Sequence, residues 1–115
     1  MRKSNPIPSY IGEFEHLLLL AILQCGDDAY TVPIRRLIEA RTGRRVARGA
    51  LYTSLDRLES KGLLTSRLGG PLAVRGGRAR RYFTPTPTGL DAVRAAHTAV
   101  LSLSQGLETL LDVRP

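Results

Sequence analysis

The sequence is poor in cysteine, tryptophan and long apolar runs. Its 115 residues include one cysteine, Cys25, no tryptophan and only 5% aromatic residues. A single cysteine excludes an internal disulfide and a metal cage of several thiolates, and it favours a reducing, intracellular location. The longest apolar run, 17–23, has seven residues, whereas a membrane-spanning helix needs about 20. Because no cleavage-type signal is present either, we expect a soluble, cytoplasmic protein of one domain with an aliphatic core.

Acidic residues are also few. The chain has 17 Lys and Arg against 10 Asp and Glu, which gives a net charge of +7, and fifteen of the bases are arginine. Residues 35–81 hold thirteen bases and three acids, whereas the remainder holds four bases and seven acids. A cationic segment between acidic flanks fits a merely solvated face less well than a phosphate-binding surface. Nucleic acid is therefore the first expected partner, and an anionic membrane surface is the second.

The apolar spacing predicts two helices in the first part of the chain. Residues 1–11 contain two prolines and are expected to form a flexible arm. The first helix covers about 12–25 and is apolar on several faces, which predicts burial against the domain and against a second subunit. The second helix is expected to be capped by Thr31 and to end at Gly43 in the left-handed conformation. The leucines of the first helix expected at a dimer interface are Leu19, Leu20 and Leu23.

A third helix and a hairpin complete the predicted domain, 12–85. The third helix covers about 48–61, and its inner stripe is Leu51, Leu55 and Leu58. Two helices joined by a short glycine-containing turn are typical of a helix-turn-helix. Residues 63–68 and 80–84 then read as two strands around a glycine-rich loop. We therefore expect a mainly α-helical fold with a small β-hairpin, which is a winged helix-turn-helix.

The last segment, 86–115, is expected to form a dimerisation helix, with Thr86 as its cap and Pro87 as its first residue. Its apolar positions step by three and four residues, as in helices that pack along a second helix. The predicted seam comprises Leu90, Val93, His97, Val100, Ser104, Leu107 and Leu111, with Leu103 and Leu110 beside it. The alternative is that this helix folds back on its own domain, but that domain already has a small core.

These motifs resemble the PadR-type transcriptional regulators. The similar segments are 13–23 in the first helix, 28–30, 49–52 and 61–63 around the helix-turn-helix, 76–83 in the wing and 84–89 at the entry to the last helix. The resemblance covers roughly residues 10–110. It implies a winged-helix homodimer that usually represses transcription, pairs through its first and last helices, and often binds a small-molecule effector near that interface. The chain departs from the family at Ala47, where a Ser or Thr cap is expected, and in its short tail.

Double-stranded DNA is the partner that these residues predict. With the third helix in the major groove, Arg48 is expected at a base edge near Thr53, and Gly49 allows close approach of the backbone. Tyr52 is expected to bind a phosphate, and the resemblance also places it toward DNA. The remaining predicted contacts are Arg44, Arg45 and Arg57 near the third helix and Arg75, Arg78, Arg80 and Arg81 in the wing, where the resemblance also places Gly77.

Wing arginines bind phosphates or enter a narrow minor groove. A two-fold dimer would read half-sites about 34–36 Å apart. Two acids on the third helix, Asp56 and Glu59, are expected to pair with Arg57 and Lys61 or to guide the helix on DNA.

Other interpretations are weaker. His16, His97 and Cys25 lack short metal-ligand spacing, so packing roles are favoured and no cofactor is expected. The serines have no His–Asp constellation near them, so no enzyme is expected. Aromatic residues leave two alternatives open: a ligand cavity lined by Tyr10, Phe14 and Tyr30, or an RNA-binding or ribosome-associated module that stacks bases on Tyr52, Tyr82 and Phe83. A third alternative is an interaction protein whose last helix docks another regulator.

Overall fold

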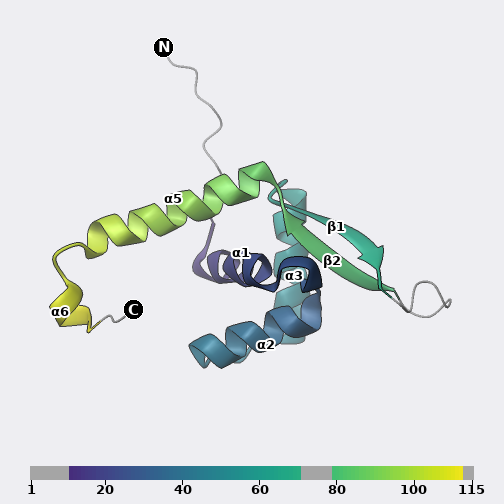
Figure 1. Ribbon diagram of the computed structural model, residues 1–115, viewed down its shortest axis with the longest axis horizontal. Helices are drawn as coiled ribbons and strands as arrows, with labels where there is room; N and C mark the ends of the chain where they lie inside the picture. Colours follow the sequence, from purple (N-terminus) through teal and green to yellow (C-terminus); the bar gives the residue numbers. More distant parts are fainter. Residues whose placement is uncertain (1–10, 71–78, 113–115) are drawn as a thin grey trace, which may run out of the picture.

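The chain folds as three helices, a two-stranded hairpin and a long helix that extends away from them (Figure 1). The computed structural model describes residues 11–70 and 79–112. The elements are α1 (Glu13–Cys25), the short 3-10 helix η1 (Gly26–Asp28), α2 (Thr31–Thr42), α3 (Arg48–Ser60), β1 (Leu64–Gly69), β2 (Arg80–Pro85), α5 (Pro87–Ser104) and α6 (Glu108–Leu111). The predicted mainly helical winged helix-turn-helix is confirmed.

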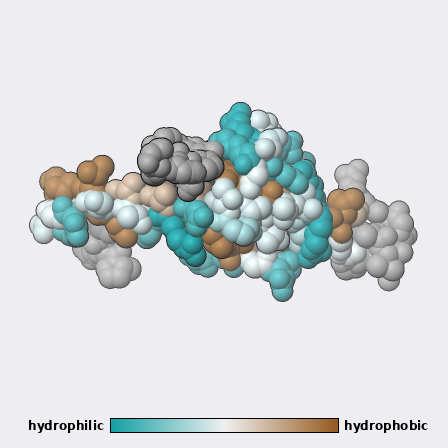
Figure 2. All heavy atoms as spheres, turned by 90° about the horizontal axis from the view of Figure 1, so that it is seen from above, coloured by the Kyte–Doolittle hydropathy of each residue, from teal (hydrophilic) through white to brown (hydrophobic). Residues whose placement is uncertain are grey.

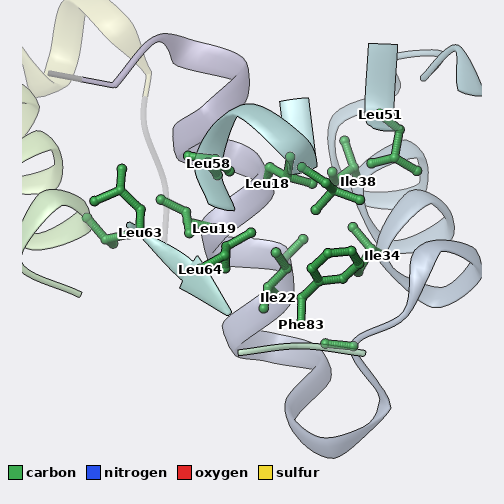
Figure 3. Packing of buried hydrophobic residues seen from close by; sticks show 14 of the residues in the cluster. Leu18, Leu19, Ile22, Ile34, Ile38, Leu51, Leu58, Leu63, Leu64 and Phe83 are labelled. Carbon is green, nitrogen blue, oxygen red and sulfur yellow. The ribbon is translucent and has the colours of Figure 1, made fainter. Parts of the chain in front are cut away.

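The core lies where α1, α2, α3 and the hairpin meet, and it is almost entirely aliphatic (Figure 3). The predicted inner stripe of α3 is confirmed, because its three leucines are at most 1% exposed. Each large aliphatic side chain buried in this way contributes about 1.5–3 kcal/mol relative to an exposed one. The other large members of the cluster are Leu18, Leu19 and Ile22 of α1, Ile34 and Ile38 of α2, Leu63 and Leu64 near the start of β1, and Phe83 of β2.

The ends of α2 agree with the prediction at one end only. Gly43 adopts the left-handed conformation, with φ at 72°, and its N–H donates to the Glu39 carbonyl at 3.0 Å. At the other end the expected Thr31 cap is wrong, because Thr31 is already the first helical residue. Tyr30 is the extended residue that links η1 to α2, and its carbonyl accepts the first helical bond from Ile34 N at 3.2 Å.

The hairpin pairs β1 and β2 antiparallel, from Leu64 opposite Pro85 to Gly69 opposite Arg80. It is tied to the helices through β2, because Phe83 N donates to the Ala29 carbonyl at 2.9 Å, just before α2. The ladder therefore holds the wing beside the helix-turn-helix. The wing residues Arg75, Gly77 and Arg78, predicted from the sequence, lie outside the described residues.

The last helix begins as predicted but ends earlier. Thr86 caps α5, since its Oγ1 accepts a hydrogen bond from Gly89 N at 3.0 Å, and Pro87 is the first helical residue. The expectation of one helix with a seam through Leu111 is wrong, because α5 ends at Ser104 and α6 is a separate short helix. Gly106, with φ at 90°, forms the break, and its N–H donates to the Glu108 carboxylate at 3.1 Å.

Candidate nucleic-acid interface

Four arginines converge around the turn between α2 and α3. Arg35 of α2, Arg44 and Arg45 of the turn, and Arg48 at the start of α3 line a shallow surface hollow of about 640 Å³. A second hollow of about 150 Å³ shares Arg35 and Arg48 and adds Thr31 and Tyr52. The shared residues make the two hollows one continuous cationic surface that joins the turn to the exposed side of α3. Among the described residues, this is where the predicted DNA contacts are brought together most closely.

Arg35 was not among the predicted contacts. Its sequence signal was its place at the start of the basic segment, beside the buried Ile34 on α2. What could not be predicted was that α2, the turn and α3 form one surface, on which Arg35 and Arg48 line the same hollow. Arg36 and Arg41 instead line a separate hollow of about 430 Å³ with Cys25 and Tyr30.

The outer side of α3 is open to a partner. Arg48, Gly49, Tyr52, Thr53 and Arg57 are all exposed, and the Tyr52 ring is 45% exposed. Ala47 precedes the helix and provides no side-chain cap. The departure from the family pattern at Ala47 therefore leaves the first turn of α3 without a capping oxygen of its own, and helix N-termini of this kind favour phosphate.

Two arginines of the hairpin flank a pair of tyrosine rings. The Arg67 guanidinium lies 4.7 Å from the Tyr82 ring centre, and the Arg80 guanidinium lies 4.4 Å from the Tyr30 ring centre. The two tyrosine rings meet edge to face with centres 5.5 Å apart. This stack connects both strands to the residue before α2, and it leaves Arg80 exposed, as expected of a DNA contact.

Arg81, in contrast, is already bound within the chain. Its guanidinium donates to Glu59 Oε1 at 2.5 Å and to Asp56 Oδ1 at 3.2 Å, both on α3. The expected pairing of these two acids with Arg57 and Lys61 is therefore wrong. Partial burial lowers the pKa of Arg81, but hydrogen bonds to Glu59 and then Asp56 outweigh it, so that the pKa is raised above its usual value.

Two further ion pairs join the helices. Lys61 Nζ, expected to pair on its own helix, binds the buried Glu15 carboxylate of α1 at 3.1 Å. Arg44, predicted to bind phosphate, lies 2.8 Å from Glu13 Oε1. The Glu13 carboxylate is 75% exposed, so this pair contributes little stability and is readily exchanged for another anion.

Within residues 11–70 and 79–112, no group of three or more His, Cys, Asp or Glu side chains is placed so that it could hold a metal ion. His16 Nε2 is buried without a hydrogen-bond partner. Burial, and secondarily the charge of His97, lower the pKa of His16. Burial, and secondarily Asp28, raise the pKa of the Cys25 thiol, which makes it less reactive.

The aromatic residues weighed as ligand or base platforms are mostly committed to packing. Tyr82 is 9% exposed and Phe83 is 2% exposed, so these two rings are not available to stack on RNA bases, as the alternative RNA-binding interpretation requires. Phe14 packs against the core, and Tyr10 lies outside the described residues. Tyr30 borders the hollow beside Cys25, which leaves it accessible at that surface.

The predicted dimerisation residues divide into core and surface. Leu19 is wrong as an interface residue, because it is 0% exposed within its own chain, and Val93 is only 7% exposed. Leu20 and Leu90 are half-buried, whereas Leu23 and His97 are exposed. The other exposed members are Val100, Leu103, Leu107, Leu110 and Leu111, to which Leu101, which was not predicted, is added. Figure 2 shows hydrophobic side chains gathered on the protruding end formed by α5 and α6.

Comparison with known proteins decides the family. The sequence model described as "Transcriptional regulator PadR-like family" matches residues 19–95, which run from α1 through the wing into α5. This chain belongs to the PadR-like family. The resemblance inferred from the helix-turn-helix and wing motifs is thereby confirmed, and the family is one of transcriptional regulators, which are generally not enzymes.

Individual proteins that are similar to this chain agree with this assignment. The chain is 41% identical over 66 residues to "Transcriptional regulator Rv3488" of Mycobacterium tuberculosis, in a match that covers 57% of this chain and 58% of the relative. It is 27% identical to a solved PadR family regulator of Eggerthella lenta, with a TM-score of 0.63 and coverage of 89% and 88%. A PadR-like regulator of Bacillus cereus, 21% identical with a TM-score of 0.69 and coverage of 88% and 93%, shares the fold.

A membrane-spanning element is not found in the described part of this PadR chain, where none of the helices has the length and hydropathy to cross a bilayer.

Proposed function

We propose that this PadR-family protein is a sequence-specific double-stranded-DNA-binding regulator that acts as a homodimeric repressor. The observation that carries the proposal is the continuous cationic surface of Arg35, Arg44, Arg45 and Arg48 beside the exposed side of α3. Forked guanidinium groups suit phosphates and guanine edges, and a helix-turn-helix presents its second helix to the major groove.

The roles within this surface follow from position. Arg48 begins α3, where base contacts are made, and Thr53 lies five residues, or about 1.4 turns, further along. Tyr52, Arg35 and Arg45 suit phosphates at the edges of the groove, and Arg44 joins them by exchanging Glu13 for a phosphate. Arg80 provides a cation on the wing. Repression is inferred from the family and requires only that the bound dimer block the transcription machinery.

A second copy of the chain is the proposed partner for α5 and α6. Their exposed leucines and valine form an apolar surface too extensive to be left in water without reason. A two-fold pair would place two α3 helices on one face of the DNA.

The test is a titration of labelled DNA at several salt concentrations. With about six phosphates neutralised, the logarithm of the binding constant should fall with the logarithm of salt with a slope of about −5. Genomic fragments recovered with the wild-type protein supply the specific site. Arg48→Ala should weaken binding to that site about tenfold or more. Arg94→Ala removes the same charge from α5, where Arg94 pairs with Asp91, and should leave binding unchanged.

A slope near zero would contradict the proposal, and so would tighter binding to single-stranded RNA than to the duplex. An equal loss of DNA affinity in the Arg48→Ala and Arg94→Ala variants would mean that binding depends only on net charge and not on the position of the arginines, which would also contradict the proposal.

A further inference from the structure

The guanidinium of Arg81 uses all three of its nitrogens within the chain. Nη2 donates to Glu59 Oε1 at 2.5 Å, Nη1 donates to Asp56 Oδ1 at 3.2 Å, and Nε donates to Ser66 Oγ at 3.2 Å. The Ser66 hydroxyl donates in turn to Glu59 Oε2 at 2.8 Å. The guanidinium carbon of Arg81 also lies 5.0 Å from the Phe83 ring centre. One side chain of β2 is thus bonded to α3 and to β1 at once.

These bonds join the wing to the recognition helix close to the outer end of the hairpin. Arg81 lies opposite Leu68, and the ladder ends at the next pair, Gly69 and Arg80. The middle of β2 is held separately by the bond from Phe83 N to the Ala29 carbonyl, just before α2. The hairpin is therefore fixed to the helices at two places, at α3 through Asp56 and Glu59 and at Ala29 through Phe83, which sets the direction in which the strands leave the domain.

The same bonds neutralise negative charge beside the DNA-binding surface. Asp56 lies one helical turn after Tyr52 on the exposed side of α3, and its carboxylate is 64% exposed. A carboxylate there would repel DNA phosphates, and Glu59, at 32% exposure, would add to the effect. Arg81 supplies the compensating charge from within the fold.

We propose that Arg81 is a positioning residue for DNA binding, which holds the wing against α3 and neutralises Asp56 and Glu59, and that it makes no phosphate contact of its own. This inference rests on the proposed DNA-binding function. It reassigns a residue that its position in an arginine-rich strand marks as a phosphate contact. Its neighbour Arg80, stacked on Tyr30 and exposed, keeps that role.

The salt dependence of binding separates the two roles. A cation that contacts phosphate releases about 0.9 counterion, so its removal makes the slope shallower by about that amount. Removal of a positioning residue lowers affinity and leaves the slope as it was. The assay is the anisotropy titration of one labelled duplex at several KCl concentrations, with the folded state of each variant checked by circular dichroism.

Arg80→Ala and Arg81→Ala form a matched pair on adjacent positions of β2. Arg80→Ala should make the slope shallower by about 0.9 for each protomer, which is about 1.8 for a bound dimer. Arg81→Ala should lower affinity about tenfold, the size of one or two unmasked surface charges, with the slope unchanged. Adding Asp56→Asn and Glu59→Gln to the Arg81→Ala variant should restore most of that loss, because the repelling carboxylates are gone.

A lysine substitution gives a second arm if Arg81→Ala does not fold. Lysine serves as a point charge for phosphate but cannot fork onto two carboxylates. Arg81→Lys should therefore bind DNA more weakly than the wild type, with the same slope. Wild-type affinity in this variant would overturn the inference, as would a shallower slope in Arg81→Ala that the acid substitutions do not rescue. Absence of salt-dependent binding by the wild-type protein would instead overturn the proposed function, and the inference with it.

Discussion

Gly89 is the residue at which a single methyl group should do most damage to the fold. It lies in the first turn of α5 against the Leu63 backbone, and a Cβ there would lie 2.1 Å from the Leu63 carbonyl oxygen. Ordinary contact begins at 3.4 Å, so α5 would have to move by about 1.3 Å. The same carbonyl accepts from Thr86 N at 3.1 Å, and Thr86 Oγ1 donates to the Gly62 carbonyl at 2.7 Å. Both hydrogen bonds are strained by that movement.

The expected cost of Gly89→Ala combines these effects. Overpacking of this kind costs about 1–3 kcal/mol, and each weakened hydrogen bond adds about 1 kcal/mol. The better helix propensity of alanine returns up to about 1 kcal/mol. We therefore expect the free energy of unfolding to fall by about 3 kcal/mol. At about 4 °C per kcal/mol for a chain of this size, Tm should fall by about 12 °C.

Gly49 provides the matched control, because it also lies in the first turn of a helix, but a Cβ there meets nothing within 4 Å. Gly49→Ala should raise the free energy of unfolding by up to about 1 kcal/mol. Thermal and urea denaturation followed by circular dichroism give both values, at one protein concentration since self-association affects stability. If Gly89→Ala proves as stable as Gly49→Ala, the close approach of α5 to Leu63 is refuted.

Two further predictions concern pH and assembly. Because burial lowers the pKa of His16, the folded chain binds fewer protons than the unfolded chain. Stability should therefore be full above the ordinary histidine pKa of 6.5 and decline as pH falls through the lowered value. His16→Gln should flatten the denaturation midpoints measured between pH 7.5 and 5.5, and parallel curves for both proteins would contradict this. Leu103→Asp combined with Leu110→Asp should convert a dimer to a monomer in size-exclusion chromatography with light scattering. The control Leu68→Asp changes another largely exposed leucine, on the hairpin, and should leave the dimer intact. A monomeric wild-type protein would contradict the proposal that α5 and α6 form the pairing surface.

Much of the fold could be predicted from local patterns in the sequence, because these features depend on interactions between residues close together in the chain. The three-and-four spacing of Leu51, Leu55 and Leu58 identified the buried side of α3. A glycine after a polar helix end predicted the left-handed Gly43, and a threonine before a proline predicted the start of α5 at Pro87. Each of these features is decided within a few residues, so the printed sequence contains it.

The predictions that are wrong concern features that depend on residues far apart in the sequence or on the conformation of a single glycine. Asp56 and Glu59 bind Arg81, 25 and 22 positions away, and helix spacing offers only Arg57 and Lys61. The apolar character of the first helix on several sides predicts Leu19 at a dimer interface, and only the packing of the other elements shows that it is buried within its own chain. The seam through Leu111 followed the spacing across Gly106, whose conformation ends the regular helix before the last two steps.

The hairpin and the segments on either side of it connect the surface proposed for DNA binding with the surface proposed for dimerisation. Arg81 bonds β2 to α3, and the Thr86 and Gly89 contacts with residues 62 and 63 bond the start of α5 to the start of β1. The surface proposed to contact DNA and the surface proposed to contact a second copy are therefore joined through one short hairpin and its two flanking segments. A rigid hairpin keeps the angle between α3 and α5 constant, and in a two-fold pair that angle sets the spacing of the two recognition helices. This gives Arg81 and Gly89 a common physical reason to be where they are, although neither is proposed here to touch DNA or the second copy.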